Sequence, residues 1–242
     1  MSLSGPEPEH GGRTPWVIMR YYRRVARVAR IREESMQGII NSRGIRPLRG
    51  WALTATTAVF IAILGPLAMA AAAFTFGSTQ KSTEGQIGQA LLGSGALFMI
   101  LAWPVVGVLV VGWLVRARAN AGLLAPTGHR LPSWWAIVGW LIPIVNFVVP
   151  VIVVSDVVRA SNPAGQNLRA VFVWWISWLV APILLAYGFF QLNRSGFPEG
   201  AVVLGRSLLG GTALYVVAAL SFRSLALTVA RWQDERMASA QG

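Results

Sequence analysis

The sequence predicts an all-α fold, a polytopic integral membrane helical bundle, on the strength of composition and charge clustering. Of the 242 residues, 55% are hydrophobic and only 12% are charged, whereas an average soluble domain carries about 25% charged residues. The charges also cluster, because none occurs in 51–76 or in 87–115. Each of these runs exceeds the roughly 20 apolar residues with which a helix crosses a bilayer. Both observations disfavour a soluble fold.

The first 50 residues are polar and basic. Residues 1–13 are rich in Gly, Pro and Ser and are predicted to be a disordered tail, and residues 14–50 a basic cytoplasmic arm. Within that arm, 16–32 has the pattern of an amphipathic helix, which predicts binding to an anionic cytoplasmic leaflet. The alternative is a solvated helix that only sets topology. The basic face of this helix consists of Arg20, Arg23, Arg24, Arg27 and Arg30.

The transmembrane helical domain is expected to cover residues 51–230. The first apolar run is too long and begins too late for a cleavable signal peptide, so it is interpreted as a retained span. Three further runs qualify as spans by the same length criterion. The four predicted spans are 51–76, 87–115, 170–192 and 201–230, and 231–242 is a charged C-terminal tail.

A fifth apolar segment, 133–158, is interrupted by prolines. Proline breaks a helix interior but is tolerated in a first turn, so Pro143 is expected to end one half-helix and Pro150 to start another. Asn146 lies between them and is expected to bond the backbone groups that the break frees. The segment then either re-enters and turns back, or crosses as one kinked helix and makes a fifth span.

The basic residues favour the re-entrant arrangement. If 133–158 crosses, 15 of the 21 basic residues lie inside and six outside; if it turns back, 18 lie inside and three outside. Cytoplasmic loops carry the excess of Lys and Arg. We therefore predict four spans plus a proline-broken re-entrant segment, with the N-terminus in the cytoplasm, and keep five spans as the alternative.

The central part of the chain resembles a known family of bacterial membrane proteins. The stretches RARANAGLL, LPSWWAIVGWLIPIVNFVVPVIVVSDVVRAS and WWISWL carry the resemblance. They are similar to the proteins grouped as domain of unknown function 4328, over roughly residues 50–230. The resemblance implies the polytopic architecture and no particular chemistry, and it leaves the basic arm outside the family pattern.

Polar residues near the broken segment form the first candidate site. Asp156 and Arg159 are three residues apart, so they can pair on one helical face. If both ends of the segment are cytoplasmic, arginines after the second span can share this carboxylate, and the cluster can bind an anionic headgroup or phosphate. A helix-end pair that only anchors the helix is the alternative. The candidate cluster is Arg116, Arg118, Asn120, Pro143, Asn146, Pro150, Asp156 and Arg159.

Tryptophans form the second candidate site. One interpretation is an aromatic cage for a cation or a lipid; the other, which the pattern favours, is interfacial anchoring and helix packing. The residues concerned are Trp134, Trp135, Trp174, Trp175 and Trp178.

No catalytic or metal-binding motif is present in the sequence, and no cofactor is predicted. The absence of cysteine excludes thiol chemistry. The net charge of +12 does not indicate nucleic-acid binding, because ten of the 21 basic residues precede Trp51 and most others flank spans. We predict a non-catalytic bacterial inner-membrane protein, a scaffold, regulatory or accessory module. A small channel or transporter subunit is the alternative, and an intramembrane enzyme is remote. The expected partners are the bilayer, anionic headgroups, and a second copy or other membrane proteins.

Overall fold

The computed structural model describes residues 27, 47–78, 83–162, 168–196 and 199–241. Across these ranges the chain is helical with connecting turns and has no strand, so the all-α prediction is confirmed. Of the predicted basic arm, Arg27 is described as helical and exposed. The tail 1–13 lies outside the described residues, as do Arg20, Arg23, Arg24 and Arg30.

Four helical stretches of the described chain are long and apolar enough to cross a membrane. The first is divided at Ile63, because Pro66 lacks the N–H that would continue the ladder. Prolines also lie inside the second and third stretches, at Pro104 and Pro182. The helices are α2 (Arg49–Ala62) with α3 (Leu64–Ser78), α4 (Thr83–Leu124), α7 (Arg169–Ser195) and α8 (Glu199–Gln241).

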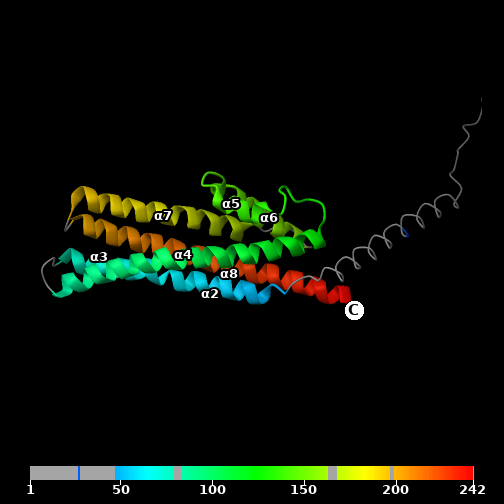
Figure 1. Ribbon diagram of the computed structural model, residues 1–242, viewed down its shortest axis with the longest axis horizontal. Helices are drawn as coiled ribbons and strands as arrows, with labels where there is room; N and C mark the ends of the chain where they lie inside the picture. Colours follow the sequence, from blue (N-terminus) through cyan, green and yellow to red (C-terminus); the bar gives the residue numbers. More distant parts are fainter. Residues whose placement is uncertain (1–26, 28–46, 79–82, 163–167, 197–198, 242) are drawn as a thin grey trace, which may run out of the picture. The chain divides into compact units, whose positions relative to one another are not determined.

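One end of this helical unit carries most of its described charges. There the start of α2, the end of α4, the start of α7 and the end of α8 come together (Figure 1). We call it the basic end and define it by Arg49, Arg116, Arg118, Arg130, Arg159, Arg169, Arg231 and Arg236.

Glycines bring the helices close together at several crossings, because they have no side chain to separate the backbones. A Cβ at Gly188 of α7 would lie 3.1 Å from the backbone Cα of Leu204 on α8. A Cβ at Gly95 of α4 would lie 3.0 Å from the carbonyl oxygen of Gly65 on α3. Gly93 and Gly107 differ, since a Cβ there would meet nothing within 4 Å.

The proline-broken segment is a helical hairpin. It consists of α5 (Trp135–Leu141), the short 3-10 turn η1 (Val145–Phe147) and α6 (Val149–Ser161), and its two α-helices are bent by 117° relative to each other. As predicted, the first half-helix ends before Pro143 and Pro150 lies in the first turn of the second. Both ends of the hairpin lie at the basic end, and its turn lies partway along α7 (Figure 1).

The boundaries of the later helices differ from those predicted. The predicted span 87–115 is part of a longer helix, α4. The segment 231–242 was predicted to be a charged tail, but α8 continues through it to Gln241. The first turn of this continuation is packed, because Gln233 is fully buried.

Candidate functional site

A buried carboxylate links the two ends of the hairpin. Asp156 of α6 is 3% exposed. The backbone N–H of Arg130, in the loop before α5, donates to its Oδ2 at 2.9 Å, and the Arg130 Nε donates to its Oδ1 at 2.8 Å. Arg130 Nη2 also donates to the Ile152 carbonyl at 3.2 Å. Arg130 thereby fastens the entry of the hairpin to its returning helix.

Two more arginine side chains lie close to the pair of Arg130 and Asp156. Arg159 Nη1 lies 4.0 Å from the Asp156 Oδ1. Arg118 of α4 is 8% exposed and donates to the Leu131 carbonyl at 3.1 Å. Such pairing is what a buried charge requires, because an isolated carboxylate at this depth would be strongly destabilising.

His129 lies beside the same cluster. Its Nε2 is 3.4 Å from the Ala121 carbonyl oxygen, and its Nδ1 is buried without a hydrogen-bond partner. Burial, and next the nearby Arg118 guanidinium, lower the pKa of His129 from its ordinary value of 6.5. The folded protein therefore favours the neutral imidazole.

A second polar network, centred on Gln233, fastens the hairpin to α4 and α8. The amide of Gln233 on α8 donates to the Ser161 hydroxyl at 2.8 Å and to the Ala117 carbonyl at 3.1 Å. Its Oε1 accepts a hydrogen bond from Asn120 Nδ2 at 2.9 Å. Arg236 Nη1 adds a bond to the Ala160 carbonyl at 3.2 Å. Three helices thus meet in one buried, hydrogen-bonded cluster.

The structure divides the predicted polar cluster into separate groups. Asp156, Arg159 and Arg118 lie close together, as predicted for a segment whose two ends lie at the same end of the bundle. Asn120 bonds Gln233 instead of joining the carboxylate. Arg116 was predicted to share Asp156, but its guanidinium carbon lies 4.7 Å above the Trp51 ring in a cation–π contact.

The hairpin turn corrects the role predicted for Asn146. Its side-chain Oδ1 is buried and accepts no hydrogen bond. The indole Nε1 of Trp175 on α7 donates instead to the freed carbonyl of Phe147, at 3.1 Å. Trp175 also packs edge-on against Trp140 of α5, with ring centroids 6.1 Å apart. A tryptophan of the neighbouring helix α7 therefore stabilises the turn, in place of the Asn146 side chain.

The predicted tryptophans occupy three different places. Trp134 and Trp135 stack on each other at the start of the hairpin, with centroids 4.5 Å apart. Trp175 holds the turn as described. Trp174 and Trp178, one helical turn apart on α7, both line a cavity between the helices.

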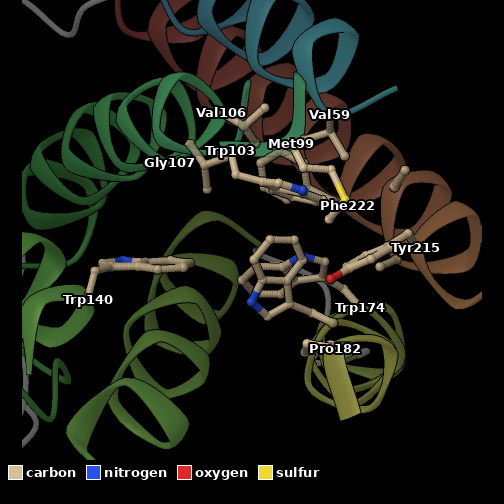
Figure 2. Close-up of a pocket in the computed structure, with 14 residues that line it drawn as sticks. Val59, Met99, Trp103, Val106, Gly107, Trp140, Trp174, Pro182, Tyr215 and Phe222 are labelled. Atoms are coloured by element: carbon tan, nitrogen blue, oxygen red, sulfur yellow. The ribbon is translucent and has the colours of Figure 1, made fainter. Parts of the chain in front are cut away.

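This aromatic cavity has a volume of about 340 Å³. Figure 2 shows Trp103 of α4, Trp140 of α5 and Trp174 of α7 directed toward the same space, with Tyr215 and Phe222 of α8 completing the wall. Trp103 and Trp178 close one side in an edge-to-face contact, with centroids 4.9 Å apart. We define the aromatic cavity by Trp103, Trp140, Trp174, Trp178, Tyr215 and Phe222.

The wall of the aromatic cavity is apolar. Its lining contains no charged residue, and beyond the aromatic side chains it consists of small or aliphatic residues, Met99 and Pro182. Such a wall favours an apolar occupant, because a polar or charged group would lose its hydration there without replacement.

Among the described residues, no group of three or more His, Cys, Asp or Glu side chains is placed to hold a metal ion. Sequence reasoning missed Arg130, because one of its two bonds to Asp156 comes from a backbone donor, which has no sequence signal. It also missed Gln233, although a signal exists: Phe222, Ala226 and Val229 form a buried stripe that reaches Gln233 at helical spacing.

Comparison with known proteins adds one finding. A family model described as "Domain of unknown function (DUF4328)" matches residues 78–233. The match includes α4, the whole hairpin, α7 and most of α8, and so both polar networks except Arg236. A search of curated proteins and a search of solved structures found no match.

Proposed function

The chain belongs to the family described as domain of unknown function 4328, and from its geometry we propose that it is a non-catalytic accessory module of the bacterial cytoplasmic membrane. In this proposal the helical bundle presents its basic end to the cytoplasm. There it scaffolds or regulates other membrane proteins and contacts anionic headgroups. The multi-pass helices support the membrane location, and the positive-inside rule supports the cytoplasmic side.

The observation that carries the proposal is how the buried polar side chains are used. Asp156 is bonded by Arg130, and Gln233 bonds Asn120, Ser161 and Ala117. Groups engaged in this way hold helices together, whereas a catalytic acid or nucleophile needs a partner poised for reaction. The polar clusters therefore support a structural role.

The outer surface of the basic end supports docking. The side chain of Arg231 is 67% exposed and that of Arg130 is 47% exposed. Arginine binds phosphate and carboxylate oxygens through several donors at once. Anionic headgroups and acidic segments of partner proteins, or of a second copy of this chain, are the ligands that suit such a surface.

One observation favours the alternative, a small channel or transporter subunit. The Asn146 Oδ1 is a buried acceptor without a partner, at the break where transporters often place their sites. Against this, neighbours of Asn146 in the turn are apolar, and Ile144 and Phe147 are 82% and 60% exposed. A solute flux into vesicles that Asn146→Leu abolishes would favour this alternative.

Site-specific photo-crosslinking in intact cells tests the accessory role. A photoreactive residue at Arg231 probes the basic end, and one at Arg194, exposed near the end of α7, is the matched control at the opposite end. We expect discrete adducts with defined membrane proteins, or with a second copy, at position 231 only. No adduct at 231, together with solute flux in vesicles of the purified protein, would contradict the proposal.

A further inference from the structure

The aromatic cavity opens sideways. Eight of its 14 lining residues are buried, five are partly exposed, among them Gly107 of α4 and Trp140 of α5, and Pro182 of α7 is exposed. Gly107 and Pro182 lie within the helical stretches that are long enough to cross a membrane, well away from the ends of those stretches. In a bilayer this mouth would face the hydrocarbon core.

The chemistry of the wall selects an apolar ligand. Binding sites combine apolar walls with a few placed polar groups that fix orientation. Here no charged side chain lines the space, and the polar groups on lining residues are the Tyr215 hydroxyl and the indole N–H groups. Figure 2 shows the Tyr215 ring projecting toward the cavity with its hydroxyl leading. Ions and polar solutes would lose their hydration in this site without replacement.

The size of the cavity suits a hydrocarbon chain. An apolar cavity of about 150 Å³ already holds a benzene molecule, and the aromatic cavity offers about 340 Å³. This space therefore suits a stretch of flexible hydrocarbon.

We propose that the aromatic cavity binds one acyl chain of a membrane phospholipid, which enters between α4 and α7 beside Trp140. The bound chain packs against Trp103, Trp174 and Trp178 and fills the space beneath the hairpin. Trp140 belongs to α5, so the occupant contacts the hairpin directly and supports its position against α7. This site does not depend on the docking role proposed above, because it lies in a different part of the molecule.

The experiment is photo-labelling of the full chain in vesicles. The probe is phosphatidylglycerol with a diazirine at the end of one acyl chain, diluted into phosphatidylglycerol and phosphatidylcholine. We expect adducts on Val106, Ala218 and Ala219, which are 4%, 3% and 1% exposed and which bulk lipid cannot reach. Adducts confined to outward residues such as Val108, 71% exposed, would overturn the proposal.

Two glycines of α4 supply a matched pair of variants. A Cβ at Gly107 or at Gly93 would meet nothing within 4 Å, but only Gly107 lines the cavity. We expect Gly107→Leu to reduce labelling of Ala218 and Ala219 at least five-fold, and Gly93→Leu to leave it unchanged. Equal labelling in both variants would contradict the site. If Gly107→Leu does not fold, the positions of the adducts on the unaltered protein still test the proposal.

Competition identifies the kind of chain. An excess of unlabelled diacyl phosphatidylglycerol should displace the probe from Ala218 and Ala219. Displacement by a polyprenyl lipid, with no displacement by the diacyl lipid at the same concentration, would overturn the assignment to an acyl chain.

Discussion

Arg130 binds both oxygens of the Asp156 carboxylate, with its backbone N–H 2.9 Å from Oδ2 and its Nε 2.8 Å from Oδ1. The two residues lie on opposite arms of the hairpin, before α5 and within α6. Their pairing therefore requires the chain to return to the end of the bundle from which it started. Because one of the two donors is a backbone group, no substitution at position 130 except proline removes it.

Asp156→Ala should destabilise the protein by about 2–3 kcal/mol, somewhat less than the roughly 3–5 kcal/mol typical for breaking a fully buried pair. The expected cost is lower because the Arg130 side chain is already 47% exposed and can be solvated by water once the carboxylate is removed. Thermal unfolding in detergent, with the yield of folded protein, measures this. Glu235→Ala is the control, since the pair of Glu235 with Arg231 is exposed on both sides. Equal stability of the two variants would show that the Asp156 pair contributes nothing specific.

Gln233→Leu should cost about 1–3 kcal/mol, because a buried amide acceptor and two donor contacts are lost at once. Gln233 is fully buried and connects α8 with Asn120 of α4 and Ser161 of α6. The matched control is Gln191→Leu, which removes one exposed hydrogen bond to Tyr187. A thermal midpoint for Gln233→Leu that equals the control would argue against a structural network.

Trp175→Phe should loosen the hairpin turn while keeping an aromatic ring in place. The change removes the donor to the Phe147 carbonyl and should cost about 1–2 kcal/mol. Hydrogen–deuterium exchange of peptides covering 142–148 is the measurement, with faster exchange expected in the variant. Trp134→Phe, at an exposed indole that stacks on Trp135, serves as the control and should leave this exchange rate unchanged.

Stability should fall as the pH is lowered below about 6.5, through His129. Its pKa is lowered in the folded state by burial and then by Arg118, so the unfolded chain binds the proton first. The contribution is therefore complete above the ordinary pKa of 6.5 and is lost as the pH falls through the folded pKa. Thermal midpoints of the protein and of His129→Gln, measured from pH 7.5 to 5, give the comparison. A pH dependence that His129→Gln leaves unchanged would exclude this residue as its source.

Much of the architecture follows from local sequence features. Long uncharged runs identify the four apolar stretches, and Pro143 and Pro150 locate the two half-helices of the hairpin. These features are predictable because each depends on a residue's own backbone chemistry or on the length of an apolar run. The number of basic residues on each side also favours the hairpin, since charge asymmetry acts on whole loops.

The contacts that hold the hairpin were less predictable. Asn146 has the right chemistry for the break, yet Trp175, 28 residues from Phe147, supplies the donor. Arg116 is close to Arg118 in sequence but lies over Trp51 instead of near Asp156. Pairings over such separations depend on how helices rotate about their axes, and an apolar run specifies that rotation only weakly. Of the five tryptophans considered for an aromatic cage, only Trp174 and Trp178 line the aromatic cavity. The rest of its wall could not be predicted for the same reason, because it comes from five separate helices.

The return of the hairpin is the central claim, and cysteine accessibility tests it most directly. The chain contains no cysteine, so single cysteines can be placed at Thr127 before the hairpin, at Asn162 after it, and at Ser195 at the opposite end. We expect an impermeant maleimide to label only Ser195→Cys in intact cells, and Thr127→Cys and Asn162→Cys only after lysis. Labelling of Asn162→Cys from outside, with Thr127→Cys and Ser195→Cys protected, would mean that the segment crosses the membrane and would contradict the account.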